Sequence, residues 1–137
     1  MRQITKFLIF LVTILTLKSC GLFDSGSDTI IDDYEVTWID LHEERALYKG
    51  EQLVPPYVFE AGHDEKYIFA KQHPLIETDD IIDLKTTNFY IIERTNEIFQ
   101  DKKTYGPLSE KQFRKLCNEL GIKNPEFELT YPTNLKW

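Results

Sequence analysis

Apolar and polar residues alternate along several short segments of the chain. In residues 34–38, aromatic and aliphatic side chains alternate with Glu35 and Thr37, the period of a half-buried strand. The same alternation recurs at 127–131, and residues 45–48 are a shorter candidate that a turn at 49–51 would close. Residues 53–59 have an extended pattern. Because Pro55 and Pro56 cannot donate ladder hydrogen bonds, they place this segment at a sheet edge or a strand entrance.

Two further segments, residues 66–70 and 88–93, each contain four consecutive apolar or aromatic residues, 67–70 and 89–92. Such a strand is buried on both faces, so we expect the first to lie at the centre of a sheet. A turn is predicted at 62–65, before the first segment, and a reversal at 95–96, after the second. Residues 97–99 would then begin a return strand. Residues 73–87, with Pro74 and several aspartates, are predicted to form a loop with a short helical turn.

A helix is predicted from Glu110 to Leu120, because both of its ends carry signals. Ser109 can cap the start with Gln112 in a capping box, and Leu108 can pack on Phe113 as a hydrophobic staple. Gly121 stands where a left-handed residue ends a helix. The apolar positions fall at i, i+3, i+4 and i+7 and form one stripe: Phe113, Leu116, Cys117 and Leu120.

Strands that precede a single helix predict an α+β fold. We expect a mainly antiparallel sheet of about five strands, with the amphipathic C-terminal helix packed on one of its faces.

The chain begins with a different pattern. Arg2 and Lys6 precede eleven consecutive residues, 7–17, that are almost all apolar. This run is too short to span a bilayer, which needs roughly 20 residues, and it has the layout of a secretory signal. The residues that follow, Leu17-Lys18-Ser19-Cys20, resemble the bacterial lipobox. Lys18 departs from the pattern, because the position two residues before the cysteine usually holds a small or aliphatic residue. The resemblance implies cleavage before Cys20 and attachment of a diacylglycerol to its thiol.

This reading divides the chain into three parts: a lipoprotein signal peptide (1–19), a lipidated flexible tether (20–32) and a single globular domain (33–137). Small and polar residues make the second part a candidate coil. Gly21 follows the cysteine, and by resemblance to enterobacterial lipoproteins an aspartate at that position would imply retention in the inner membrane. We therefore expect the outer membrane in a Gram-negative cell, and otherwise the outer face of the cell membrane.

Removing residues 1–19 takes away three of the 16 basic residues and none of the 23 acidic ones, which leaves a formal net charge of −10 over 118 residues. Such a charge argues against nucleic acid as a partner. With Cys20 alkylated, Cys117 has no intramolecular disulfide partner, so the fold would depend on its core alone.

A family resemblance appears in the predicted elements themselves. Residues 66–72 and 88–92, and then Tyr105-Gly106-Pro107-Leu108-Ser109 leading into Phe113 and Leu120, resemble a family of short bacterial envelope lipoproteins of unknown function. The similarity covers about 53–122 and the lipobox. It implies an envelope lipoprotein, with no activity attached.

Candidate chemistry is sparse. His42, Glu43 and Glu44 are metal-capable but form a solvated charge run, whereas His63 and His73, with Glu60 and Asp64, could meet near one end of the sheet. The remaining candidates are better explained structurally. Cys117 is a core residue, Asp79, Asp80 and Asp83 lack the ladder of a calcium loop, Tyr105-Gly106-Pro107 is the turn that aims the helix, and Trp137 is an exposed end or a lid on the core.

The sequence thus predicts no catalytic residues, no cofactor and no enzyme. The leading hypothesis is a membrane-anchored, non-catalytic binding or accessory module, held by Cys20, with a possible envelope protein as partner. One alternative is an inhibitor or immunity-type protein against a basic toxin or lytic enzyme. The other is a small metal-binding protein or enzyme that uses His63 and His73.

Overall fold

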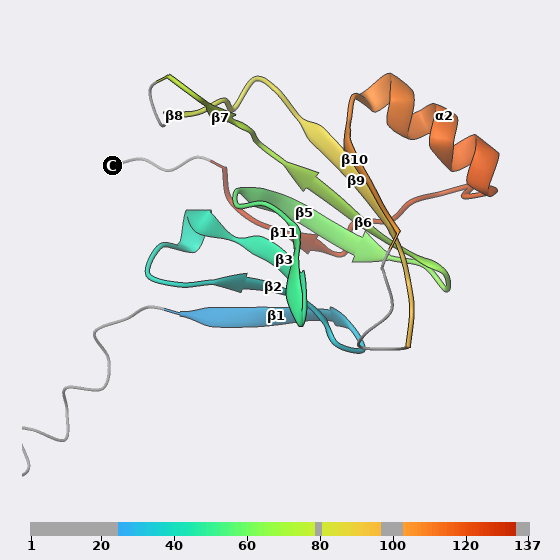
Figure 1. The fold of residues 1–137 in the computed structure, drawn as a ribbon, viewed down its shortest axis with the longest axis horizontal. Helices are drawn as coiled ribbons and strands as arrows, with labels where there is room; N and C mark the ends of the chain where they lie inside the picture. Colours follow the sequence, from blue (N-terminus) through green and yellow to red (C-terminus); the bar gives the residue numbers. More distant parts are fainter. Residues whose placement is uncertain (1–24, 79–80, 97–102, 134–137) are drawn as a thin grey trace, which may run out of the picture.

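A computed structural model describes residues 25–78, 81–96 and 103–133. It confirms the α+β class: eleven strands form sheets of four, five and two strands, and a single α-helix, α2 (Glu110–Leu120), lies near the C-terminal end of the described chain (Figure 1). No helix among these residues has the length and apolar character needed to cross a membrane.

The four-stranded sheet is an antiparallel meander in the order β1-β2-β3-β4. Its bounds are β1 Gly26–Ile31, β2 Tyr34–Trp38, β3 Ala46–Lys49 and β4 Glu51–Val54, and a short 3-10 helix, η1 (His42–Glu44), lies between β2 and β3. The predicted tether, residues 20–32, is shorter than expected, because residues 26–31 form β1, in which Gly26 pairs with Trp38 and Asp28 with Val36. Ordered structure therefore begins before Asp33, and residues 20–24 lie outside the described residues.

The five-stranded sheet has the order β10-β9-β6-β5-β11. Its bounds are β5 Val58–His63, β6 Tyr67–Gln72, β9 Asn88–Glu93, β10 Thr104–Leu108 and β11 Leu129–Thr130. β6 is central, as its continuous apolar run predicts: Ile68, Phe69 and Ala70 are fully buried. Phe69 pairs with Ile91 of β9, which is also fully buried.

The molecule has three layers, with the five-stranded sheet in the middle (Figure 1). One face of that sheet contributes Ile68, Ala70 and Ile92 to a core shared with Tyr34 and Val36 of the four-stranded sheet. The opposite face contributes Phe69 and Ile91 to a second core with α2. The alternation along β6 and β9 sends neighbouring side chains to opposite faces, so each strand serves both cores.

The helix begins and ends as the sequence predicts. Gln112 N–H donates to Ser109 Oγ (3.3 Å), Ser109 N–H donates to Gln112 Oε1 (2.8 Å), and Gly121 adopts a left-handed conformation with φ 73°. Phe113 and Cys117 are buried, and Leu108, Leu116 and Leu120 pack around them. The predicted packing of the helix stripe on the sheet is therefore confirmed.

Several local predictions are wrong. In their described part, residues 73–87 contain a short turn at 83–86, closed by the bond from Thr86 N–H to the carbonyl oxygen of Asp83 (3.2 Å), but they are not otherwise a loop. They instead form a two-stranded hairpin, β7 (Leu75–Ile76) with β8 (Ile81–Ile82). Tyr105-Gly106-Pro107 lies within strand β10, which has an irregular register there and is not a turn. Gly62 and His63 belong to β5, so the predicted turn begins at Asp64. The predicted return strand at 97–99 and Trp137 lie outside the described residues.

Candidate functional site

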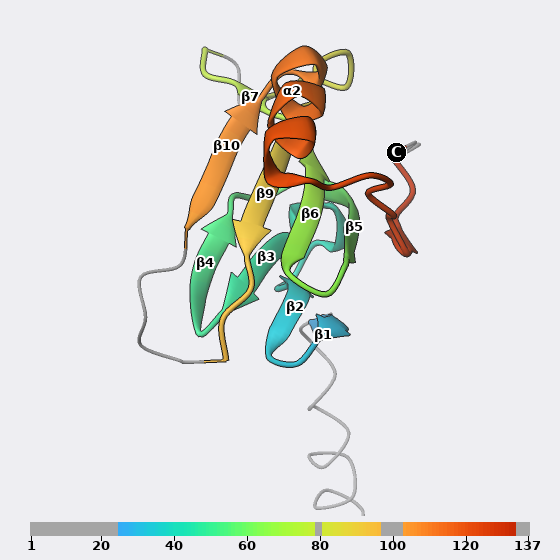
Figure 2. The ribbon, with the colours of Figure 1, turned by 90° about the vertical axis from the view of Figure 1, so that its right-hand side faces the viewer.

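A groove of about 450 Å³ lies between α2 and the segment 122–127, over the outer face of the five-stranded sheet. A volume of this size is in the range of small-ligand sites. Its floor is formed by Phe89, Phe113, Cys117 and Phe127, and cationic residues, Lys71, Arg114 and Lys123, line it as well. Figure 2 shows the chain leaving α2, crossing the sheet and reaching β11 beside β5.

The floor residues face the groove because of the strand pairing in the sheet and the spacing of residues along the helix. Lys71 pairs with Phe89 across β6 and β9, so both side chains lie on the same face. Phe113 and Cys117 are four residues apart on α2 and face the sheet together. Phe127 reaches the floor because its segment lies directly on Gly62, where a side chain would collide with the backbone of Glu126.

The floor is an aromatic cluster. The ring centroids of Phe89 and Phe113 are 4.8 Å apart, and those of Phe113 and Phe127 are 6.4 Å apart. Phe69 meets Phe113 edge to face at 6.5 Å from beneath. These distances are within the range of favourable aromatic pairs, so the floor is apolar and its rings pack on one another.

The lining also concentrates positive charge. Lys71 Nζ lies 4.2 Å above the Phe127 ring and forms an ion pair with Glu60. Arg114 pairs with Glu110 one helical turn earlier (2.6 Å). Lys123 is exposed and forms no ion pair within the described part of the chain. Glu110 lies in the lining as well, so Lys123 is the lining cation that has no acidic partner among the described residues. In a chain with net charge −7, this cation beside an aromatic floor favours a ligand that has an apolar part and a negative charge.

Cys117 lies in the groove lining but is only 5% exposed. Burial, with a smaller contribution from the negative charge of Asp64, raises the pKa of its thiol. The thiolate is the nucleophilic form of cysteine, so this side chain is a packing residue, as the sequence predicts.

His63 and His73, which could have met near one end of the sheet, lie apart. His63 pairs with Ile68 at one end of β6, whereas His73 follows the other end, so the two residues are on the order of 15 Å apart. His63 Nε2 lies 3.3 Å from Glu128, and His73 stacks on Phe59 with its Nδ1 2.8 Å from the carbonyl oxygen of Thr86. No three His, Cys, Asp or Glu residues in the described ranges are grouped to hold a metal ion.

The other candidate residues that the structure describes make local contacts within the fold. His42 lies in η1 and its ring contacts Trp38, with centroids 5.4 Å apart. Asp83 accepts hydrogen bonds from Thr86 Oγ1 (2.7 Å) and Lys85 N–H (3.0 Å), and these bonds lower the pKa of its carboxyl. Cys20, Asp79 and Asp80 lie outside the described residues.

A second groove, of about 370 Å³, lies on the outer face of the four-stranded sheet. Glu35, Glu44 and Tyr48 line it together with Ile39. Neither glutamate forms an ion pair with another described residue. This groove is therefore apolar and acidic, the opposite in charge of the groove beside α2.

Comparison with known proteins finds one family model, described as "Protein of unknown function (DUF3997)", which matches residues 29–132. No curated protein and no solved structure matches the chain. The matched range includes every described element except the first residues of β1 and covers more of the chain than the resemblance at 53–122. It begins after Cys20, so lipid attachment stays a prediction.

Proposed function

The chain belongs to the DUF3997 family of unknown function, and from this premise we propose that it is a lipid-anchored protein of the bacterial cell envelope whose domain is a non-catalytic binding module. The observation that carries the anchoring is the sequence Leu17-Lys18-Ser19-Cys20 after a charged and then apolar N-terminal segment.

The anchor sets the location of the domain. Each buried methylene of an acyl chain contributes about 0.8 kcal/mol, and one myristoyl chain gives only reversible binding, whereas two or three chains bind a membrane stably. The domain would lie on the outer membrane in a Gram-negative cell, or on the outer face of the membrane in a cell with one membrane.

Metabolic labelling tests the anchor. Cells that express the full chain and grow in radiolabelled palmitate should label the wild-type protein and not Cys20→Ala. Cys117→Ala is the matched control and should keep the label, because that thiol is buried in the second core. Absence of label on the wild type, or equal label on Cys20→Ala, would refute lipid attachment.

The groove beside α2 supports the binding role. It combines the aromatic floor of Phe89, Phe113 and Phe127 with Lys123, an exposed cation without an ion pair within the described part of the chain. Its one thiol is buried and has a raised pKa. We infer a ligand or partner segment that carries an apolar group next to a carboxylate or phosphate.

Site-specific photo-crosslinking in intact cells tests this surface. A crosslinker at Asn118, which lines the groove, should capture an envelope component, whereas one at Lys115, which is exposed on α2 outside the lining, should not. Lys123→Glu should abolish the capture at Asn118 because it reverses the charge of the rim. Equal capture at both positions, or capture that survives Lys123→Glu, would count against the groove.

The acidic groove supports a second candidate, an inhibitor or immunity-type protein against a basic toxin or lytic enzyme. Glu35 and Glu44 could receive a basic side chain next to Ile39. A double variant, Glu35→Gln with Glu44→Gln, would then sensitise cells to such an enzyme, whereas Glu51→Gln with Glu93→Gln would not. Unchanged survival of the first variant with every neighbouring toxin gene would exclude this function.

A further inference from the structure

The large exposed apolar side chains are confined to two segments of the described chain. Residues 39–41 contribute Ile39 and Leu41, which are 64% and 43% exposed. Residues 75–84 contribute four more side chains, which are between 40% and 56% exposed: Leu75, Ile76, Ile81 and Leu84. Isolated apolar residues are common on surfaces, whereas a group of them marks a contact surface.

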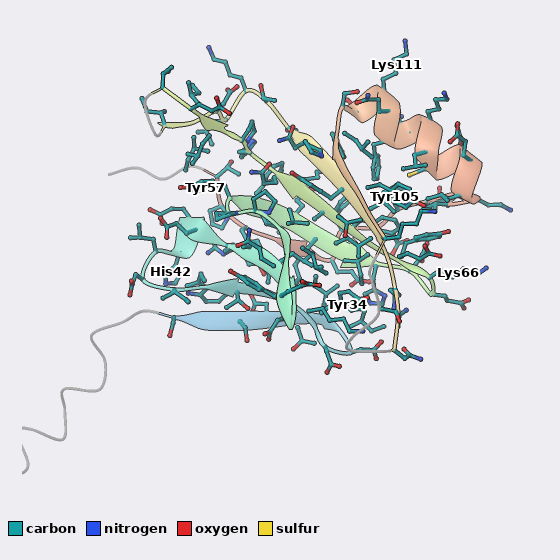
Figure 3. The ribbon with its side chains drawn as sticks, in the orientation of Figure 1. Tyr34, His42, Tyr57, Lys66, Tyr105 and Lys111 are labelled. Carbon is teal, nitrogen blue, oxygen red and sulfur yellow. The ribbon has the colours of Figure 1, made fainter. Side chains whose placement is uncertain are left out.

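Both segments lie at one end of the molecule, and we call them together the loop end. Segment 39–41 follows Trp38, which pairs with Gly26, so it lies beside the start of β1. The β7–β8 hairpin connects the C-terminal end of β6 to the start of β9. Figure 1 shows both segments and the start of β1 at the left of the molecule, and Figure 3 places His42 there and Lys66 at the opposite end.

We propose that the loop end rests on the membrane that holds the lipid of Cys20 and inserts its apolar side chains among the lipids. The inference rests on the proposed function for the anchor itself. Cys20 precedes Gly26 by six residues, and a chain of that length spans at most about 20 Å. The loop end is therefore the part of the domain that the anchor holds nearest to the bilayer.

The charge of the loop end determines which lipids it accepts. In the sequence, residues 39–44 and 75–85 contain seven acidic residues against one lysine, Lys85, namely Asp40, Glu43, Glu44, Glu77, Asp79, Asp80 and Asp83. Anionic headgroups repel such a surface. The insertion is therefore stronger in a zwitterionic bilayer than in an anionic one, and salt strengthens it in the anionic bilayer by screening the repulsion.

Fluorescence quenching by lipids tests the contact. The full-length lipidated protein is reconstituted in phosphatidylethanolamine/phosphatidylcholine vesicles with an environment-sensitive dye on Ile81→Cys or, as the control at the far end, on Lys66→Cys. Cys117 is buried and does not take the dye under native conditions. Lipids with nitroxide-labelled chains should quench the dye at position 81 at least threefold more than the dye at position 66.

Flotation of the same samples separates this inference from the proposed anchor. Vesicle-bound protein with equal quenching at both positions overturns the membrane contact while the anchor stands. Protein that does not float overturns the anchor and the contact with it. A blue-shifted dye at position 81 without lipid quenching means that protein covers the loop end, which also overturns the inference. Replacing half of the lipid with phosphatidylglycerol should reduce the quenching at position 81, and salt should restore it.

Discussion

At the scale of single residues, Gly62 determines how the C-terminal segment lies on the five-stranded sheet. A Cβ atom at this position would lie 2.0 Å from the carbonyl oxygen of Glu126 and 2.8 Å from Cα of Phe127. Both atoms belong to the backbone, so a side chain at position 62 would displace the segment that forms one wall of the groove.

Gly62→Ala should therefore lower the free energy of unfolding by about 1–3 kcal/mol through overpacking, measured by urea denaturation. It should also speed labelling of the Cys117 thiol in the native state, because the displaced segment uncovers it. Gly50→Ala is the control: Gly50 has φ 71° and open space around it, so alanine there is strained but leaves the thiol covered. Equal labelling rates in the two variants would contradict this packing.

The thiol of Cys117 links stability to pH. Burial raises its pKa in the folded state, so its contribution to stability is complete below the unfolded pKa and is lost as pH rises toward the folded value. Stability should fall from about pH 8.5 upward, before the tyrosines titrate near 10. Urea midpoints at pH 7 and 9.5 should differ more for the wild type than for Cys117→Ala. A difference that is the same in both proteins would refute this linkage.

At the scale of elements, the sequence predicts those whose signals are local. The capping box of Ser109 and Gln112 defines α2, and continuous apolar runs define β6 and β9. β1 is missed because its first residues, Gly26, Ser27 and Asp28, have the composition of a linker, and it forms by pairing with β2. β10 is missed because Gly106 and Pro107 indicate a turn, whereas pairing with β9 extends the chain there.

The helix offers a direct test of the second core. Phe113 is 5% exposed and contacts the rings of Phe69, Phe89 and Phe127. Phe113→Asp would remove these contacts and bury an unpaired charge, so it should cost at least about 4 kcal/mol. Arg114→Gln, on the exposed side of the same helix, should change stability by less than about 0.5 kcal/mol. Thermal denaturation measures both, and a melting temperature of Phe113→Asp within error of wild type would contradict the packing.

At the scale of the whole molecule, cationic side chains join the layers at both ends. Arg45 is 7% exposed and lies between the rings of Trp38 and Tyr131, at 5.4 and 4.2 Å, while Tyr131 Oη donates to Asp28 (2.8 Å). At the opposite end, Arg94 Nη1 donates to the carbonyl oxygens of Asp64 (2.8 Å) and Glu65 (2.9 Å), and its Nη2 donates to Asp32 (2.8 Å). The turn between β1 and β2 is thereby fixed to the turn between β5 and β6.

Arg94→Lys should cost about 1.5–3 kcal/mol, because an ammonium group cannot reproduce three hydrogen bonds of a planar guanidinium. Arg114→Lys is the matched control and should cost less than about 0.5 kcal/mol, since its pair with Glu110 is exposed. Chemical denaturation of both variants measures the difference. Equal stability of the two would show that Arg94 does not hold the sheets together.

The groove could not be predicted from the sequence because no local segment contains it. Lys71, Phe89, Phe113 and Phe127 come from four separate parts of the chain, and only the strand register and the close approach at Gly62 bring them together. The distance between His63 and His73 was likewise open in the sequence, because the two residues flank β6 and only the length of that strand shows that they lie at its opposite ends.

The position of β1 has a mechanical consequence. β1 is an edge strand, and its first residue is the one through which the chain continues back toward Cys20. α2 lies toward the opposite end of the molecule from the start of β1 (Figure 1). If a partner bound near α2 moved away from the membrane, the force between that partner and the lipid anchor would act along the direction of β1. The hydrogen bonds between β1 and β2 would then share that load in shear and would not peel apart one after another.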